Sequence, residues 1–275
     1  MKRPLTRLAL FAATAVALTG CATFTDSDVA ARVDDQELTT DELNSIAREQ
    51  LGDEALRADT QTILAILNNW VLDQVLRADL AANGQPLTAP EGELTNDGLT
   101  ASISESFGIW QQTPPTPVPD EAIRARYELG AVESNLICPA HVLVEEEATA
   151  NEVLDLLDQG ASYAETAAEF SIDGSAANGG NLPCATTVDF SQQYIPEFVE
   201  AALDAEIGVP VGPVQSEFGY HVILLRPYDD ISSDELQAIL STPQVRFDFA
   251  AEDVDVYVHP RYGSFNASSG IVPLG

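Results

Sequence analysis

A proline-rich run near the middle of the chain sets the main constraint on its fold. Pro114, Pro115, Pro117 and Pro119 fall within residues 113–119, and proline both fixes φ and lacks the amide hydrogen that a helix needs. This run cannot be helical and should form a stiff polyproline connector. Because 275 residues suffice for two modest domains, the run predicts one domain on each side of it.

The first 20 residues have the pattern of an export signal. Three basic residues precede an apolar run over residues 8–18, which is too short to cross a bilayer. The run ends in Leu18-Thr19-Gly20-Cys21, which resembles the lipobox of bacterial lipoproteins, whose cysteine becomes the lipidated first residue of the mature chain. An ordinary cleaved signal and an uncleaved anchor are the alternatives. Lipidation of Cys21 would tether an extracytoplasmic protein to the bacterial cell membrane.

The charge of the mature region is strongly negative. The chain has 12 Lys and Arg against 44 Asp and Glu, and three of the basic residues lie in the predicted signal, which leaves 9 against 44 from residue 21 onward. Such a charge repels phosphate backbones, so nucleic acid is not an expected partner. The hydrophobic fraction of 45% is too high for a wholly disordered acidic chain.

Two cysteines remain once Cys21 is assigned to lipid. Cys138 and Cys184 form an even pair in an oxidising compartment, which favours a disulfide, with two buried free thiols as the alternative. A disulfide would close a loop of about 46 residues and stabilise the fold by roughly 4 kcal/mol in the loop-entropy model. The His and Cys residues lack the short spacing of a zinc site, so we expect no metal and no other cofactor.

The part of the chain before the connector is predicted to be mainly helical. Residues 29–38 alternate between apolar and polar, and Thr40-Asp41-Glu42 then provides an N-cap with acidic residues in the first turn of a helix. A broad apolar stripe over residues 63–80 predicts a second helix that ends near Asn83-Gly84. Residues 85–108 contain several turn-forming residues, and are predicted to be mostly loop with one short helix.

The part after the connector alternates strands and helices. A short helix at 122–129 is followed by a strand at 136–144 that carries His141, two helices, a polar glycine-rich loop at 171–182, a further helix, and two strands of which the last carries His221. This β-α-α-loop-α-β-β order over about 95 residues describes a small α+β domain. The tail is predicted to contain a helix at 233–240 and a strand at 254–258.

Short motifs occur in a fixed order between residues 136 and 228. They are His141-Val-Leu-Val, Phe170-Ser-x-Asp173, Gly179-Gly-x-Leu182, Phe198 followed by Ala201-Ala202-Leu203, Gly212-Pro-Val, and Phe218-Gly-Tyr-His221-Val-Ile. Together they resemble the parvulin (PpiC, rotamase) family of peptidyl-prolyl cis-trans isomerases. The whole layout resembles the PrsA-like and SurA-like extracytoplasmic folding factors.

This resemblance implies an α+β fold class with two folded units. One is a parvulin-like domain with a small antiparallel sheet and surrounding helices, and the other is a mainly helical SurA-N-like lobe completed by the C-terminal segment. The implied divisions are a lipoprotein signal peptide at 1–20, a helical chaperone-like lobe at 21–112, the connector with a short helix at 113–134, the parvulin domain at 135–229, and a returning C-terminal segment at 230–275. Residues 29–38 should pair with the strand at 254–258.

The resemblance also implies an apolar socket for the proline ring, whose residues map onto Leu182, Tyr194, Phe198 and Phe218. Rotation about an X-Pro bond meets a barrier of about 18–20 kcal/mol from amide resonance, and it needs no nucleophile or metal in principle. A socket that holds the ring, excludes water and binds the twisted amide better than either planar form is sufficient.

The polar centre of the family's site maps onto His141, Asp173, Ser216 and His221. We expect the two imidazoles to form a hydrogen-bond chain that Ser216 bridges. Asp173 should face the substrate carbonyl and act electrostatically. His259 lies outside the motifs and is expected to be a surface or turn residue.

Two departures from the family pattern bear on the site. The family commonly has Gly-Gly-Asp-Leu-Gly, whereas this chain has Gly179-Gly180-Asn181-Leu182-Pro183, and the proline should re-aim the strand entry after the loop. A Cys138–Cys184 bridge would then staple the wall of the site. Glu145-Glu146-Glu147 stands where some parvulins carry basic residues for phosphate, which disfavours phosphorylated and acidic residues before proline.

The expected function is that of a membrane-tethered prolyl isomerase that assists the folding of exported proteins. Its expected partners are unfolded or nascent exported polypeptides that contain X-Pro bonds, together with the membrane through a lipid at Cys21. The alternative is a non-enzymatic holdase chaperone whose parvulin domain is inactive.

Overall fold

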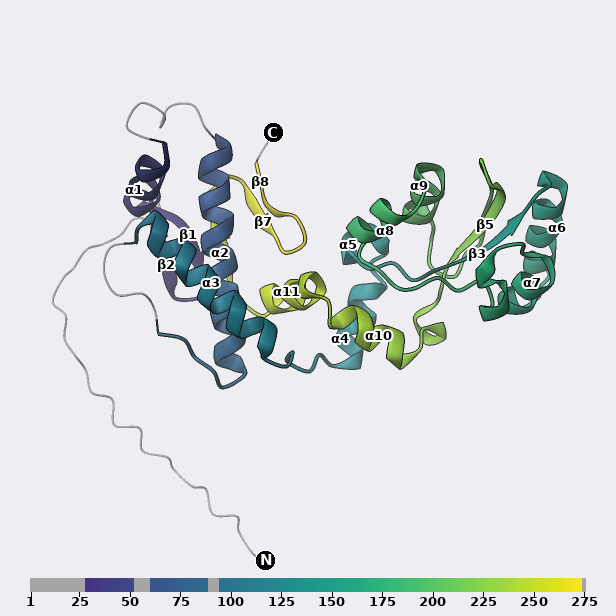
Figure 1. Cartoon of the computed structure of the whole chain (residues 1–275), viewed down its shortest axis with the longest axis horizontal. Coiled ribbons are helices and arrows are strands. Elements are labelled where there is room, and N and C mark those ends of the chain that lie inside the picture. The colour runs from purple at the N-terminus through teal and green to yellow at the C-terminus, as the bar shows by residue number, and fades with distance from the viewer. Residues whose placement is uncertain (1–27, 52–59, 89–93, 274–275) are drawn as a thin grey trace, which may run out of the picture.

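The computed structural model describes residues 28–51, 60–88 and 94–273, so the predicted signal and Cys21 lie outside the described residues. Figure 1 shows two lobes at opposite ends of an elongated molecule, joined by an extended connector and by short helices between them. Within the described ranges, no helix combines the length and the apolar character that a membrane span requires.

The first lobe packs helices against a sheet formed by both ends of the described chain. Strands β1 (Val29–Val33), β2 (Gln36–Thr39) and β6 (Val256–Val258) form an antiparallel sheet in the order β2-β1-β6, and Ala31 lies opposite Val258. The hairpin of β7 (Ser264–Asn266) and β8 (Gly270–Val272) follows and contacts helix α2 (Thr60–Ala82). The expected return of the C-terminal segment to this lobe is therefore confirmed.

Helix α1 (Thr40–Leu51) begins where it was predicted to begin, but helix α3 (Asn96–Gln112) replaces what was predicted to be mostly loop, and that prediction is wrong. Asn96-Asp97-Gly98 forms the first turn of α3, because the Thr95 side chain accepts a hydrogen bond from the Gly98 amide at 3.0 Å. The helix packs along α2, and its Ser102 and Ser106 hydroxyls donate to the buried Asp73 carboxylate at 2.6 and 2.7 Å.

Short helices fill the space between the lobes. They are α4 (Asp120–Tyr127), α5 (Ala131–Ser134), α10 (Ser233–Leu240) and α11 (Pro243–Glu252), of which α5 and α11 were not predicted. Arg126 of α4 and Asp248 of α11 are both buried, and Arg126 Nη2 lies 3.1 Å from an Asp248 carboxylate oxygen. Asp248 also accepts from the Asn135 amide and the Ser268 hydroxyl, so its charge is well compensated.

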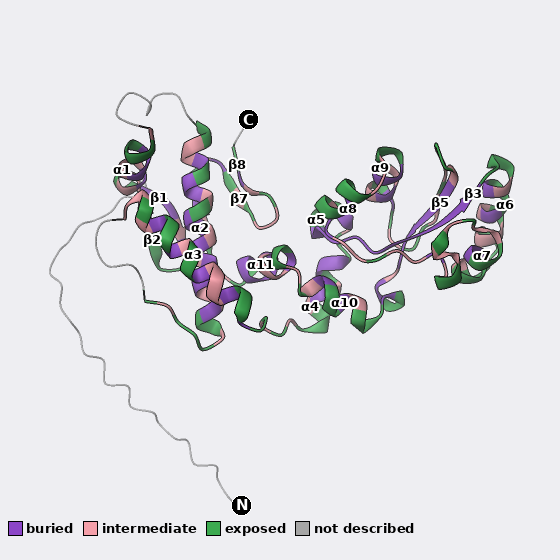
Figure 2. Cartoon of the chain, viewed as in Figure 1, coloured by how far each residue is buried: buried purple, intermediate pink, exposed green. Residues whose placement is uncertain are grey.

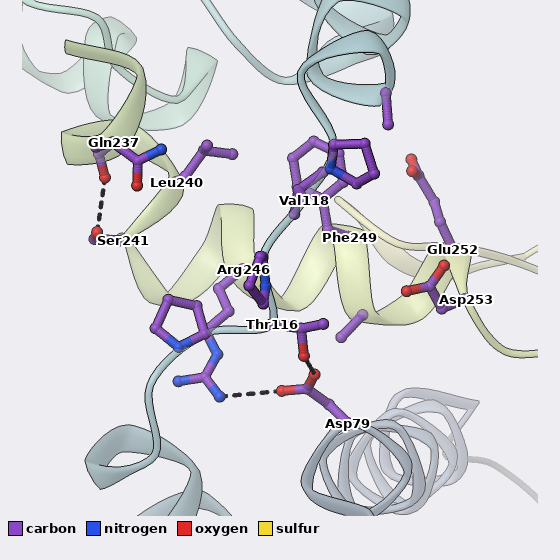
Figure 3. A pocket seen from close by; sticks show the side chains of 15 residues that line it. Asp79, Thr116, Val118, Gln237, Leu240, Ser241, Arg246, Phe249, Glu252 and Asp253 are labelled. Carbon is purple, nitrogen blue, oxygen red and sulfur yellow. Dashed lines mark hydrogen bonds and ion pairs between the residues drawn. The ribbon is translucent and has the colours of Figure 1, made fainter. Parts of the chain in front are cut away.

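A cavity of about 320 Å³ lies beside the connector, between α2, α10 and α11 (Figure 3). The Asp79 carboxylate of α2 accepts from Thr116 of the connector at 2.8 Å and pairs with Arg246 of α11 at 3.1 Å. The Arg246 guanidinium also lies 4.0 Å from the centre of the Trp110 ring. One carboxylate thus ties the connector and the C-terminal segment to the first lobe.

The second lobe is a three-stranded antiparallel sheet covered by helices on both faces. Its strands β3 (Pro139–Val144), β5 (Gly219–Leu225) and β4 (Val211–Ser216) lie in the order β3-β5-β4. Figure 2 shows β3 and β5 as largely buried. Val142 and Val222 face α6 (Glu147–Asp158) and α7 (Tyr163–Phe170), whereas Ile223 packs with residues of α8 (Thr187–Gln193) and α9 (Pro196–Asp204).

The segment after the glycine-rich loop runs along the free edge of β3. Ala140 pairs with Asn181, and Ile137 pairs with Ala185, both antiparallel. Two residues of the β3 side therefore face three residues at positions 182–184, which form a bulge around Pro183. Because proline has no amide hydrogen to give to the ladder, the irregularity falls where the sequence departs from the family pattern.

Candidate active site

Strand register brings the two predicted histidines to one face of the sheet. His141 of β3 lies opposite Ile223, and Leu143 lies opposite His221 of β5. Residues opposite each other share a face, as do residues two apart on one strand. His141 and His221 are therefore diagonal neighbours on the face that α8 and α9 cover. Both are buried, with 6% and 4% exposure.

The two imidazole rings contact each other directly. Their centres are 5.5 Å apart with an interplanar angle of 15°, and the Nδ1 atoms are separated by 3.2 Å. Ser216 Oγ lies 2.8 Å from His221 Nε2, and Asp173 Oδ1 lies 3.0 Å from His141 Nε2. The expectation that Ser216 bridges the rings is wrong, because the serine stands at one end of the chain of groups and the aspartate at the other.

This order of groups limits where the protons can lie. His141 Nε2 is in contact with the Asp173 carboxylate at 3.0 Å but makes no hydrogen bond in this structure. Because Asp173 only accepts, a hydrogen on His141 Nε2 would face it and leave Nδ1 as an acceptor. His221 would then donate from Nδ1 and accept at Nε2 from the Ser216 hydroxyl, which also lies 3.4 Å from the Gly219 carbonyl oxygen. The Ser216 oxygen also accepts the Phe218 amide at 3.1 Å, so the hydroxyl is held from both sides.

The electrostatics of the site favour a neutral His221 and a charged Asp173. Burial, and then the neighbouring His141, lower the pKa of His221 to about 4. Partial burial alone would raise the pKa of Asp173, but hydrogen bonds from Ser175 and His141 lower it to about 2. The two groups are therefore a neutral imidazole and a carboxylate near pH 7. Asp173 is one-third exposed and also caps the short turn at Gly174–Asn178.

A glycine allows the loop that carries Asp173 to lie against β3. Gly180 has φ of +77°, and a Cβ at this position would lie 2.5 Å from the His141 carbonyl oxygen. The Gly180 carbonyl accepts the His141 amide at 2.9 Å. Backbone contact between loop and strand therefore needs glycine here, and it sets the distance between the aspartate and the imidazole.

Aromatic rings line the apolar side of the two histidines. The Phe198 ring of α9 is 5.3 Å from the His141 ring and 5.2 Å from the His221 ring, centre to centre. Tyr194 lies 5.5 Å from Phe198 on the other side. Leu182 and Tyr194 are half-buried and pack on this group. Burial and the charge of Asp173 raise the pKa of Tyr194, so its hydroxyl stays protonated.

The structure does not bring every predicted socket residue together, and it adds one. Phe218 sits at the turn between β4 and β5 with 58% exposure, and its ring is not among the ring contacts found around Phe198. Phe190 of α8 was not predicted, yet it is fully buried and its ring is 4.7 Å from Tyr194 and 5.8 Å from Phe198. Phe190 lies four residues before Tyr194, and this helical spacing could have indicated that the two rings lie on the same face. We call Phe190, Tyr194 and Phe198 the ring cluster.

The predicted disulfide is present, and it lies at the edge of this site. Cys138 and Cys184 are joined, with their Cα atoms 4.1 Å apart. Cys138 directly precedes β3, and Cys184 ends the bulge that follows Leu182. His259 lies in the first lobe, away from the site, and accepts a local hydrogen bond from the Arg261 amide. Among residues 28–51, 60–88 and 94–273, we find no cluster of three or more His, Cys, Asp or Glu side chains suited to a metal ion.

Comparison with known families agrees with this site. Residues 140–226 match the model of the PPIC-type PPIase domain. The second lobe is thus a peptidyl-prolyl cis-trans isomerase domain of the parvulin class, as the motifs indicated.

Curated relatives are foldases named PrsA. The chain is 35% identical over 167 residues to the foldase protein PrsA of Halalkalibacterium halodurans, an alignment that covers 53% of this chain and 49% of that protein. It is 29% identical over 244 residues to foldase protein PrsA 1 of Bacillus cereus, with 82% and 80% covered. The match therefore spans about half of the first relative and most of the second. The crystal structure of PrsA from Bacillus subtilis aligns at 24% identity over 83% of this chain and 90% of that chain, with a TM-score of 0.33.

Proposed function

We propose that this chain is an extracytoplasmic, membrane-tethered prolyl isomerase that assists the folding of exported proteins by twisting X-Pro bonds without covalent chemistry. The observation that carries this proposal is the row of polar groups Ser216, His221, His141 and Asp173, each in contact with the next, beside the ring cluster. It places a polar surface and an apolar one side by side, which matches the two halves of an X-Pro unit.

The apolar side supplies the binding energy for the proline ring. Leu182 and Tyr194 are half-exposed, while Phe190 and Phe198 behind them are buried and hold their positions. Burying a ring of this size against such a surface is worth roughly 1.5–3 kcal/mol. Phe218, exposed at the adjacent turn, is in a position to cover a bound segment. The socket would thus hold the ring while the preceding residue rotates.

The polar side acts on the amide during rotation. A twisted amide loses resonance, so its nitrogen gains lone-pair density and its carbonyl becomes less polar. The carboxylate of Asp173 disfavours negative charge on a nearby carbonyl oxygen, and therefore favours the twisted over the planar amide. The Ser175 amide and hydroxyl donate to the Asp173 carboxylate and hold it beside His141 Nε2, which lies 3.0 Å away. Binding the twisted form more strongly than the planar forms lowers the barrier.

Ser216 has a supporting role in this mechanism. It lies beside a histidine, as a nucleophile would, but its oxygen already accepts the Phe218 amide and its hydrogen goes to His221. We expect Ser216→Ala to retain isomerase activity within about tenfold of the wild type, whereas loss of a true nucleophile costs on the order of 10⁶-fold.

The deciding experiment is an isomerisation assay with a proline-containing peptide, using the wild type, His221→Ala and Asp173→Ala. The wild type should accelerate cis-trans exchange well above the buffer rate, and both variants should be slower than the wild type. A folded wild type that is no faster than buffer would contradict the enzymatic proposal.

A second candidate function is that of a holdase, because the first lobe contains an apolar cavity of about 460 Å³. Helices α2, α3 and α11 and the β7–β8 hairpin line it, with Leu72, Phe107, Phe247 and Phe265 among the apolar side chains. Suppression of aggregation of a proline-free unfolded protein would support this role. Phe247→Ser should weaken the suppression and leave isomerase activity unchanged.

Membrane tethering rests on the Leu18-Thr19-Gly20-Cys21 motif. Metabolic labelling with a radioactive fatty acid should modify the wild type in a bacterial host, and Cys21→Ala should abolish the label. Absence of label in a wild type that is exported would contradict lipidation.

A further inference from the structure

The bulge at residues 182–184 joins a socket residue to the disulfide. Leu182 packs on the ring cluster, Pro183 is exposed, and Cys184 is bonded to Cys138. The Leu182 amide donates to the Pro139 carbonyl at 3.0 Å, but Pro183 has no amide hydrogen, and the ladder resumes at Ala185. Bulges beside active sites commonly re-aim a side chain. The orientation of the Leu182 side chain therefore depends on the contacts that hold the irregular backbone of residues 182–184.

Arg226 contacts the bulge through its side chain. It directly follows β5, the strand that carries His221, and only 2% of it is exposed. Its Nη2 donates to the Leu182 carbonyl at 3.2 Å and lies 3.6 Å from Cys184 Sγ. Its Nε donates to the Cys138 carbonyl at 3.3 Å. One guanidinium thus bonds to both segments that the disulfide joins.

Glu235 of α10 neutralises this buried guanidinium. Its two carboxylate oxygens lie 2.7 and 3.3 Å from Nη2 and Nη1, which is a forked geometry. The same carboxylate accepts the Ser232 amide and hydroxyl in the capping box of α10. The negative charge is therefore held by the start of a helix as well as by the arginine, and it keeps Arg226 pointing at the bulge.

We propose that Arg226, oriented by Glu235, is a positioning residue that holds Leu182 in the proline socket. The role rests on the proposed isomerase function, and it extends the substrate site to a residue outside all the sequence motifs. A lysine cannot take its place, because a single ammonium cannot donate in the plane of the fork to Glu235 while reaching the Cys138 and Leu182 carbonyls. The Leu182 carbonyl would then lose its buried donor, whereas the Cys138 carbonyl would keep only the backbone amide of residue 226, which donates to it at 3.1 Å.

The test is a double-mutant cycle with Arg226→Lys and Leu182→Ala on a neutral prolyl peptide. Each single variant should raise KM roughly 5- to 10-fold, since it removes or misplaces an apolar contact worth about 1 kcal/mol or more, and kcat should change less than twofold. If Arg226 acts through Leu182, the double variant should be no worse than the poorer single one. The pH profile should stay that of the wild type, because the histidine chain is not altered.

Two further variants guard against a merely structural effect. Glu235→Gln keeps the shape of the side chain but weakens the ion pair with Arg226, so it should also raise KM. This variant provides the test if Arg226→Lys does not fold. Arg77→Lys is the matched control: Arg77 is also buried and pairs with Asp73 at 2.9 Å, but it lies in the first lobe. It should lower the melting temperature and leave KM unchanged.

The outcomes separate the two proposals. Additive losses in the double variant, or an unchanged KM in folded Arg226→Lys and Glu235→Gln, would overturn the positioning role and leave the isomerase function intact. An inactive wild type would overturn both. Faster amide hydrogen exchange at Leu182 in Arg226→Lys would show the loosening of the bulge directly, and the expected result is a specific increase there.

Discussion

The Nδ1 atoms of His141 and His221 lie 3.2 Å apart, so one proton serves both rings. A proton on both Nδ1 atoms would set two N–H groups against each other, and a proton on neither would leave two lone pairs in contact. The pair can therefore take up one additional proton but not two.

The direction of the hydrogen-bond chain is testable through Asp173→Asn. In the wild type, the hydrogens should reside on His141 Nε2 and His221 Nδ1, and the nitrogen-15 shifts of the rings report this tautomer. An asparagine can present its amide hydrogen to His141 Nε2, which would reverse the chain and move the hydrogens to His141 Nδ1 and His221 Nε2. We expect reversed shifts and a loss of roughly 10- to 100-fold in kcat/KM. Wild-type shifts of the opposite tautomer would contradict the assignment.

The buried histidine pair should make the protein less stable in acid. The pKa of His221 is about 4 in the folded state against 6.5 in the unfolded state, so the unfolded state binds more protons between these values. The contribution of His221 to the free energy of unfolding is therefore fully present above about pH 6.5. It is lost as the pH drops toward 4, and the loss is at most roughly 3 kcal/mol. Urea unfolding at a series of pH values measures this change in the free energy of unfolding. His221→Gln should flatten this part of the curve, and His259→Gln should not.

The Cys138–Cys184 disulfide should stabilise the second lobe more than the first. The two cysteines are 46 residues apart, and a loop of this size is worth roughly 4 kcal/mol in the loop-entropy model. Reduction, or the double change Cys138→Ala and Cys184→Ala, should lower the unfolding midpoint of the second lobe. Protection of amides in β3 and β5 reports that lobe, and protection in α2 serves as the internal control. Two free thiols in the unfolded, unreduced protein would disprove the bond.

The three glutamates that follow β3 should select against acidic peptides. Glu145, Glu146 and Glu147 are exposed at the end of β3, the strand that holds His141. We expect kcat/KM to fall in the order Lys-Pro, Ala-Pro, Glu-Pro, phosphoserine-Pro, and the spread to shrink as salt screens the carboxylates. Replacing all three glutamates by glutamine should reduce the spread. Faster turnover of the phosphorylated peptide than of the alanine peptide would refute this preference.

The sequence predicted the second lobe well because its signals are local and ordered. Each strand with a histidine, the glycine-rich loop and the helix with Phe198 were found where the structure has them. In the first lobe, Asn96-Asp97-Gly98 favoured a turn, but Thr95 capping and packing against α2 outweighed the low helix propensity of these residues. Helix α11 has apolar and polar residues all round, since it contacts both lobes, and so lacks a helical stripe.

The side-chain chemistry of the site was only partly predictable. The polar residues that meet followed from the motifs, but the order in which they meet depends on register and rotamers, and the aromatic set differed by the absence of Phe218 and the presence of Phe190. That is why Ser216 was expected between the imidazoles and is found at the end of the chain. The ion pair of Arg226 with Glu235 was not predicted, because neither residue belongs to a quoted motif and only the tertiary structure brings the two side chains together at the bulge.

The pairing of β1 with β6 has a consequence for the order in which the molecule forms. The residues of the isomerase lobe are contiguous, and its sheet and disulfide can be completed as soon as Leu225 has emerged. The β1 strand, by contrast, waits for Val256–Val258 before its open edge is covered. If the chain emerges from its amino end, the second lobe can therefore fold before the first lobe, whose sheet is complete only when β6 has emerged.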